Sequence, residues 1–217
     1  MRYRVLCLFL ILLAIYLHFF TNFDVNFQSI FYSNGHWIID PNDPVIYFYL
    51  YKLPKAIIVV LGLLTLTTLI LNQYKKFLNQ NTRTSLITVL VSIVLFPIFI
   101  NLLKELIRQP CPRDLKIFGG HFDLDFISFF LTRGDIKCFP GAHASAPFSM
   151  LSAVYLFNKE YYKKIFISLM LFIASIISMY QVLRGVHFIT DTVCTAGLSW
   201  LFIYYVNKIN LLYRQKV

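Results

Sequence analysis

The stretch TSLITVLVSIVLFPIFINLLKELIRQPCPRD, residues 84–114, begins with a long apolar run and ends in a cluster of basic residues and prolines. Its first part, 84–103, has no charged residue and is about as long as the ~20 residues with which a helix crosses a bilayer. Pro110 and Pro112 then end the helical geometry. Similar apolar runs recur along nearly the whole chain, at about 4–20, 54–72, 144–158, 164–183 and 188–206.

The composition indicates the same class of protein. Of the 217 residues, 58% are hydrophobic and only 14% are charged. A soluble domain of this size still exposes a large surface to water, so it cannot hide that much apolar surface in one core. We therefore predict an all-α, polytopic membrane protein: a bundle of six transmembrane helices in a single domain, residues 1–217. The first run lacks a small-residue cleavage site, so we expect a retained helix rather than a signal peptide.

The formal net charge of +10 does not indicate nucleic-acid binding, because the basic residues lie in short clusters between apolar runs. An even number of spans places both termini on one side, together with the loops 73–83 and 159–163, in which Lys and Arg are concentrated. The positive-inside rule makes this side cytoplasmic. Residues 21–53, 104–143 and 184–187 are then expected on the extracytoplasmic face.

The first group with chemical potential is KELIRQPCPRD, residues 104–114. Lys104, Arg108 and Arg113 cluster where an anionic lipid headgroup would lie. They are candidates for binding phosphate. The alternative is a belt of interfacial cations whose side chains reach the phosphates of the surrounding phospholipids.

The second group is CFPGAHAS, residues 138–145, where a small-residue turn leads into an apolar helix. A helix start offers free backbone N–H groups and the positive end of the helix dipole, which suit a phosphate oxygen. Gly141 and Ala142 would supply these amides, with His143 beside them. A single histidine at a helix start is otherwise a cap or a loop residue.

The third group is QVLRGVHFITD, residues 181–191. His187 and Asp191 are four residues apart, so on a helix they share one face and can form a hydrogen bond. A carboxylate on one ring nitrogen fixes the tautomer and makes the other nitrogen a better nucleophile or base. Arg184 lies within reach of the same anion. The alternative, an Asp–His pair that only satisfies itself, is disfavoured because ionisable groups at a membrane are expensive.

Together these groups resemble the type 2 phosphatidic acid phosphatase (PAP2) superfamily of membrane lipid phosphatases. The pattern of that family is Lys-x6-Arg-Pro, then Pro-Ser-Gly-His, then Ser-Arg-x5-His-x3-Asp. The resemblance covers residues 104–191: Lys104 and Pro112 match the first motif, His143 the second, and His187 and Asp191 the third.

The resemblance implies a role for each matching residue. His187 would be the nucleophile that forms a phosphohistidine, and Asp191 would orient it. His143 would be the general acid for the leaving alcohol, and Lys104 would bind phosphate oxygens. Neither a metal nor another cofactor is expected.

Each of the three motifs departs from the family pattern at one place. The residues missing there are an arginine in the first motif, a serine in the second, and a serine and an arginine in the third. Arg108 and Arg113 flank the first vacant position, and Ser145 lies close to the missing hydroxyl. Arg184, one helical turn beyond the second vacant arginine, could present a guanidinium to the same place. The replacements are Cys111 for arginine, Gly141-Ala142 for Ser-Gly, and Tyr180-Gln181 for Ser-Arg.

The cysteines and the remaining polar loop leave other possibilities open. Cys111 and Cys138 are both expected outside, where a disulfide would tie the first motif to the second; free thiols are the alternative. The loop GGHFDLDF, residues 119–126, suggests a metal site, but a solvated rim is favoured. Trp37, Tyr47 and Tyr49 are expected to be interfacial aromatic residues.

The sequence thus predicts a lipid phosphatase of the bacterial inner membrane with a periplasmic active site. By analogy with the bacterial lipid A phosphatases, the first choice of substrate is the 1-phosphate of lipid A, ahead of the 4′ position. Undecaprenyl pyrophosphate and phosphatidylglycerol phosphate are alternatives, as is phosphate transfer from one lipid to another. A different class is a membrane protein that binds anionic lipid without turnover. The expected partner is the lipid substrate, with no obligate protein partner.

Overall fold

The computed structural model describes residues 2–123 and 136–216, which are mostly helical. The α-helices are α1 (Arg2–Phe20), α2 (Phe23–Ser29), α3 (Pro44–Tyr47), α4 (Leu53–Lys75), α5 (Gln80–Ile107), α7 (Ala142–Ser149), α8 (Glu160–Leu183) and α9 (Ile189–Lys216). A π-helical turn, Phe48–Lys52, joins α3 to α4, and 3-10 turns cover Pro112–Asp114, Lys116–Phe118 and Met150–Leu156. A hairpin of two short strands, β1 (Tyr32–Ser33) and β2 (His36–Trp37), follows α2.

Within the described residues, four helical segments are long and apolar enough to cross a membrane: Pro44–Lys75, Gln80–Asp114, Glu160–Leu183 and Ile189–Gln215. The pair α1 and α2 makes a fifth only if both are counted as one span, because α2 turns away from α1 by 81°. A helical membrane architecture is therefore supported. The predicted number of six spans is not confirmed.

The fourth predicted span, 144–158, is not a continuous α-helix. It consists of α7 followed by the 3-10 segment Met150–Leu156. Pro147 lies inside α7 and has no N–H to donate, which weakens the α-helical ladder. Downstream, the Ser149 and Ser152 hydroxyls bond the carbonyls of the third residue before each, at 2.7 Å, competing with backbone N–H groups. The result is a short, broken element rather than a standard transmembrane helix.

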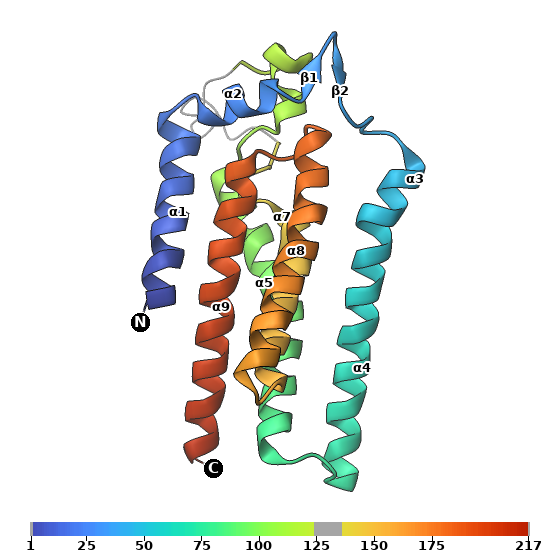
Figure 1. Ribbon diagram of the computed structural model, residues 1–217, viewed down its shortest axis with the longest axis vertical. Helices are drawn as coiled ribbons and strands as arrows, with labels where there is room; N and C mark the ends of the chain where they lie inside the picture. The colour runs from blue at the N-terminus through green and yellow to red at the C-terminus, as the bar shows by residue number, and fades with distance from the viewer. Residues whose placement is uncertain (1, 124–135, 217) are drawn as a thin grey trace.

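The broken element runs through the interior of the bundle, whereas the long helices surround it. The helix α7 contacts α4, α5, α8 and α9, and α9 packs against α1 and α5 as well (Figure 1). Polar contacts also join two long helices: the Asn210 side chain donates to the Thr84 carbonyl at 2.8 Å and to the Thr88 hydroxyl at 3.2 Å. Such interhelical hydrogen bonds fix the register of two apolar helices.

The chain places its two groups of loops at opposite ends of the molecule (Figure 1). One end holds the α1–α2 corner, the start of α4, the end of α5, the start of α7 and the α8–α9 corner. The other end holds the α4–α5 and 3-10–α8 connections and the C-terminus, while the N-terminus lies partway along the bundle. The loops 73–83 and 159–163 therefore lie at the end away from the three motifs, and which end faces the cytoplasm stays a prediction.

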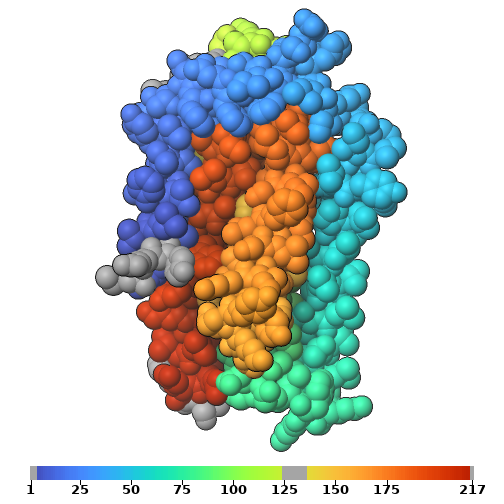
Figure 2. Space-filling model, viewed as in Figure 1, coloured from blue at the N-terminus to red at the C-terminus, as the bar shows by residue number. Residues whose placement is uncertain are grey.

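The N-terminal segment, from α2 through β2 (23–37), covers the end of the bundle where the motifs lie. Figure 2 shows it as a blue band across the tops of α8 and α9. The Gln28 side chain donates to the Val182 carbonyl at 2.7 Å, and the ring of Trp37 lies against Gly185. Gly185 has φ +69°, and a Cβ there would lie 2.3 Å from the indole. Only glycine fits this corner, because both the backbone conformation and the contact exclude a side chain.

Candidate active site

The three sequence motifs come together at the covered end of the bundle. Lys104 comes from the last turns of α5, His143 from the first turn of α7, and His187 from the corner between α8 and α9. Backbone bonds join these segments: the Arg113 amide donates to the Gly185 carbonyl at 3.0 Å. His143 and His187, which are 44 positions apart in sequence, are in contact at this end of the bundle.

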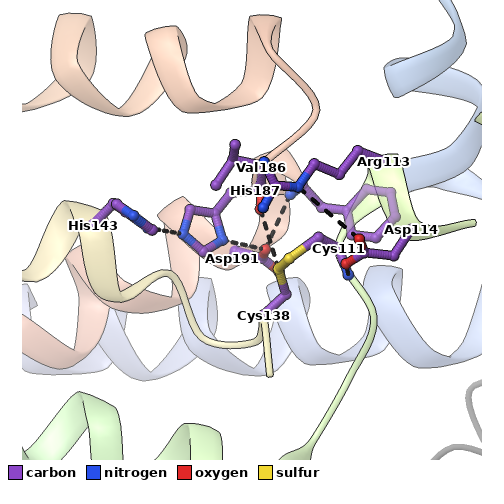
Figure 3. The surroundings of a disulfide bond; sticks show 9 residues. Cys111, Arg113, Asp114, Cys138, His143, Val186, His187 and Asp191 are labelled. Carbon is purple, nitrogen blue, oxygen red and sulfur yellow. Dashed lines mark hydrogen bonds and ion pairs between the residues drawn. A yellow bond between two sulfur atoms is a disulfide. The ribbon is translucent and has the colours of Figure 1, made fainter. Parts of the chain in front are cut away.

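His187 is bonded at both ring nitrogens (Figure 3). Its Nδ1 lies 3.1 Å from Oδ2 of Asp191, and its Nε2 lies 2.8 Å from Nδ1 of His143. Asp191 Oδ2 also accepts the backbone N–H of Phe188 at 3.0 Å. The side chains of His187 and Asp191 are buried, whereas His143 is partly buried and forms the accessible edge of the group.

The positions of the ring protons follow if Asp191 is ionised, a state that the bond from the Phe188 N–H favours. An ionised Asp191 can only accept, so Nδ1 of His187 carries the hydrogen and Nε2 carries a lone pair. The Nδ1–H of His143 then donates to that lone pair. One imidazole therefore occupies the lone pair of the other.

The surroundings keep both imidazoles neutral. Burial is the main cause, and the nearby charges of Lys104, Arg113 and Arg184 add to it. They lower the pKa of His187 from 6.5 to about 3. Burial, the facing ring of His187 and the same cations lower the pKa of His143 to about 2. The three cations, which are the smaller cause of these shifts, would attract an anion, whereas burial alone would not.

Two arginines reach the site in different ways. Arg184 is buried at 8% exposure, and its guanidinium lies between the rings of Tyr47 and Tyr180, 5.1 and 5.2 Å from their centres. It donates to the Tyr180 hydroxyl at 2.8 Å. Arg113 is more exposed, with Nε 4.0 Å from Asp114. Tyr47 is thus a contact of Arg184, in addition to the interfacial position predicted for it.

Some buried polar atoms beside His187 lack a hydrogen-bond partner among the described residues. They are Nε of Arg184, both amide atoms of Gln181 and Oδ1 of Asp191. Gln181 occupies the position where the family pattern has arginine. Buried donors without a partner are rare in folded proteins, so these atoms mark the surroundings of His187 as unusual.

Two residues predicted to bind phosphate have other contacts in the structure. The N–H of Gly141 donates to the Asp191 carbonyl at 3.3 Å, so this amide joins α7 to α9 rather than pointing freely from the helix start. Arg108 is the left-handed residue that ends α5, with φ 46°. Its side chain bonds the Glu105 carbonyl at 3.0 Å and lies 3.8 Å from the Glu105 carboxylate. Ala142 remains at the site, where it lines a cavity.

A disulfide joins Cys111 to Cys138, with Cα atoms 5.1 Å apart (Figure 3). The backbone N–H of Cys138 donates to the Gln109 carbonyl at 2.8 Å, which holds the same two segments together. The link ties the first motif to the segment that leads into His143. Cys7 and Cys194 are free and buried within α1 and α9.

A cavity of about 300 Å³ opens beside His143 between α4, α5, α7 and α8. Lys104, His143, Tyr51 and Lys55 line it where it meets the site. The ring of Tyr51 lies at a tilt to that of His143, with ring centres 5.0 Å apart. Asn101 and Ser145 also line it, and most of the other lining side chains are apolar, among them Ile58, Pro97, Pro147 and Ile177. The cavity therefore offers cationic groups beside an apolar wall.

Sequence reasoning missed several residues around the site. The contacts of Tyr47 and Tyr180 with Arg184 were not predicted. Tyr51 lies against His143, and a second buried His–Asp pair, His18 and Asp24, bonds Thr190 at the start of α9. The signal that could have found this pair is an ionisable residue at the end of an apolar run, which is unusual in membrane helices.

Among residues 2–123 and 136–216, no three His, Cys, Asp or Glu side chains are grouped as metal ligands. In the loop weighed as a metal site, Asp123 forms an ion pair with Lys116 at 2.7 Å. Asp125 lies outside the described residues.

One comparison with known proteins gives a match. The family model described as the PAP2 superfamily matches residues 85–213, which include all three motifs. No curated protein and no solved structure matches the chain.

Proposed function

This chain belongs to the PAP2 superfamily, whose members are phosphatases, and we propose that it hydrolyses a phosphate monoester of a membrane lipid. The observation that carries the proposal is His187, whose two nitrogens are bonded to Asp191 at 3.1 Å and to His143 at 2.8 Å. A nucleophile, an orienting carboxylate and a second imidazole in one row are the groups that phosphoryl transfer through a histidine requires.

Substrate binding must first separate the two imidazoles. A distance of 2.8 Å between their nitrogens is a hydrogen-bond length and leaves no room for a phosphorus atom. A phosphate that enters between them would bring its oxygens toward the cations, including Lys104 and Arg184. Its negative charge would offset those cations and allow His143 to hold a proton that it lacks in the empty site.

In the first chemical step, Nε2 of His187 attacks phosphorus. The N–P bond forms, the bond from phosphorus to the leaving oxygen breaks, and His143 gives its proton to that oxygen. Asp191 accepts from Nδ1 of His187 and stabilises the positive ring that the attack creates. The cations spread the charge on the phosphoryl oxygens.

In the second step, water attacks the phosphohistidine. His143, now without the proton it gave to the alcohol, takes a proton from this water. The N–P bond breaks, inorganic phosphate is released, and His187 returns to its neutral form. No metal is used in either step of this proposal.

The cavity supports a lipid as the substrate. It joins the site to an apolar wall formed partly by Ile58 and Pro97, in helices that carry long apolar surfaces. A phosphate held at Lys104 and His143 would leave its hydrocarbon part in apolar surroundings. Sites of a few hundred cubic ångströms, mostly apolar with few polar groups, are typical of small-molecule binding.

Our first choice of substrate remains the 1-phosphate of lipid A in the outer leaflet of a bacterial inner membrane, with the site facing the periplasm. The support is analogy within the superfamily and the concentration of Lys and Arg in loops 73–83 and 159–163. Undecaprenyl pyrophosphate and phosphatidylglycerol phosphate are the alternative substrates. Transfer of phosphate to another lipid is the alternative reaction.

The test uses the purified full-length chain with a panel of lipid phosphates: phosphatidic acid, phosphatidylglycerol phosphate, undecaprenyl pyrophosphate and lipid A. We expect release of inorganic phosphate from at least one of them, unchanged by EDTA. His187→Ala should lower the rate by more than about 1,000-fold, because the nucleophile is gone. Lys164→Ala, at the opposite end of the bundle, is the control.

A protein that only binds anionic lipid would give a different result. It would release no phosphate, and His187→Ala would keep nearly all of its lipid affinity. EDTA sensitivity would count against the histidine mechanism. With a substrate labelled in its phosphate, transfer of the label only to an added acceptor lipid would indicate a phosphotransferase.

A further inference from the structure

A second His–Asp pair lies behind the active site, at the corner between α1 and α2. Nδ1 of His18 lies 2.7 Å from Oδ2 of Asp24, and both side chains are at most 1% exposed. Asp24 continues to the start of α9. The Thr190 hydroxyl donates to Oδ2 of Asp24, and the Thr190 backbone N–H donates to Oδ1 at 3.4 Å.

The placement of this pair is specific rather than incidental. The His18 ring is stacked on Phe139 at 4.6 Å and meets Phe188 edge-on at 5.6 Å, so its surroundings are largely aromatic. Ionisable groups buried among apolar rings are stable only when they are bonded to one another. Here each group of the chain His18, Asp24 and Thr190 bonds the next.

The chain of bonds ends one residue from the catalytic carboxylate. Thr190 stands in the first turn of α9, next to Asp191. Asp24 therefore caps α9 from another helix: its carboxylate takes an N–H of the first turn, where negative charge is favourable. Both His–Asp pairs thus bond the first turn of α9, His18–Asp24 through Thr190 and His187 through Asp191 itself.

We propose that His18, Asp24 and Thr190 form a positioning unit that fixes the first turn of α9 and thereby aims Asp191 at His187. This inference rests on the proposed function, because it assigns the unit a role in phosphoryl transfer. The unit touches neither phosphate nor the reacting nitrogens. It acts through Asp191, whose second oxygen has no described partner and whose orientation depends on the backbone of this turn.

The position of the unit also assigns a role to α1 and α2. Residues 18 and 24 lie outside the matched range 85–213. The part of the chain that carries the family motifs therefore relies on α1 and α2 for the support behind its catalytic carboxylate.

The test compares Thr190→Val with Thr190→Ser in the full-length protein. Valine keeps the shape and removes the hydroxyl, whereas serine keeps the hydroxyl. With the panel lipid that gives the highest wild-type rate, Thr190→Val should lower kcat about 10- to 100-fold, with KM changed less than about 3-fold. Thr190→Ser should stay within about 3-fold of wild type.

Two further measurements separate positioning from general stability. Thr192→Val removes a hydroxyl from the same turn without touching Asp24 and should leave kcat near wild type. Formation of phosphohistidine at His187, followed by rapid quench, should be slower in Thr190→Val than in wild type. The rate per folded molecule should fall by the same factor as kcat. Asp24→Asn keeps an acceptor oxygen and is the second variant if Thr190→Val cannot be purified folded; it should also lower kcat.

The outcomes are distinct. If the wild-type protein turns over and Thr190→Val has the same kcat, the positioning role is overturned and the proposed function stays in place. The same holds for Asp24→Asn where that variant is used. Equal losses in the valine and serine variants, or in Thr192→Val, also overturn it. A wild-type protein without turnover on the whole panel overturns both proposals.

Discussion

His187 is bonded at two nitrogens, and the two bonds have different consequences. Asp191 on Nδ1 fixes which nitrogen has the lone pair, and His143 on Nε2 occupies that lone pair while the site is empty. Both consequences follow from neutral imidazoles, since a protonated His187 could not accept from His143. The burial that lowers both pKa values is therefore part of the chemistry.

The lowered pKa values predict how stability depends on pH. Above about pH 6.5 both imidazoles are neutral in the folded and in the unfolded chain, so they cause no loss of folding stability. Below it, the unfolded chain takes up protons that the folded site resists. Stability then falls as the pH drops from 6.5 toward 3, by about 1.4 kcal/mol per pH unit for each imidazole.

The measurement is the unfolding temperature in detergent at pH 7 and pH 4.5. The double variant His143→Gln with His187→Gln lacks both groups and should lose less stability between these pH values than wild type. An equal loss in both proteins would show that other groups cause the acid sensitivity.

At the residue scale, sequence could predict contacts within one helix turn but not those made across the bundle. His187 and Asp191 were found because they are four residues apart at a helix start. His18 and Asp24 meet because the chain bends by 81° between two helices. The bonds of Gly141 and Arg108 depend on how α7 meets α9 and how α5 ends, which local patterns do not encode.

At the element scale, the long apolar helices were predicted from length and composition, which suffice when a segment is continuous. The segment 144–158 was misread because apolar content does not distinguish an α-helix from a 3-10 helix. Its proline and the serines bonded to nearby carbonyls decide the local geometry. The β1–β2 hairpin was not predicted.

The disulfide between Cys111 and Cys138 is the covalent tie between two elements of the site. It closes a loop across a sequence separation of 27, for which loop entropy corresponds to about 3 to 4 kcal/mol. Replacing both cysteines by serine should lower the unfolding temperature and the activity, because Arg113 and His143 lose their link. Cys7→Ala, which removes a free sulfur, is the control.

Mass spectrometry of unreduced protein should find the peptides of Cys111 and Cys138 linked. Two free thiols in the unreduced protein would contradict the bond. Equal losses of stability in the double serine variant and in Cys7→Ala would show that the bond contributes nothing beyond packing.

At the scale of the whole molecule, the family match covers residues 85–213, but the site has contacts from outside it. Gln28 bonds Val182, and Trp37 packs with Phe118 and Phe188 in one apolar cluster. We expect residues 79–217 expressed alone to be inactive, because these partners would be left exposed to solvent or lipid.

Co-expression of 1–78 with 79–217 tests this expectation. The break falls in the short α4–α5 connection, at the end of the bundle away from the site (Figure 1). The two pieces together should restore phosphate release. Full activity of 79–217 alone would show that residues 1–78 are dispensable.

The bond between His143 and His187 has a consequence for the end of the catalytic cycle. In the proposed mechanism, once water has cleaved the bond between phosphate and His187, the two imidazoles can rejoin at 2.8 Å only if the anion departs. The free energy of re-forming this bond therefore opposes product retention, although several cations surround the site. An enzyme with such a self-closing pair can bind phosphate esters strongly during reaction and still discharge inorganic phosphate.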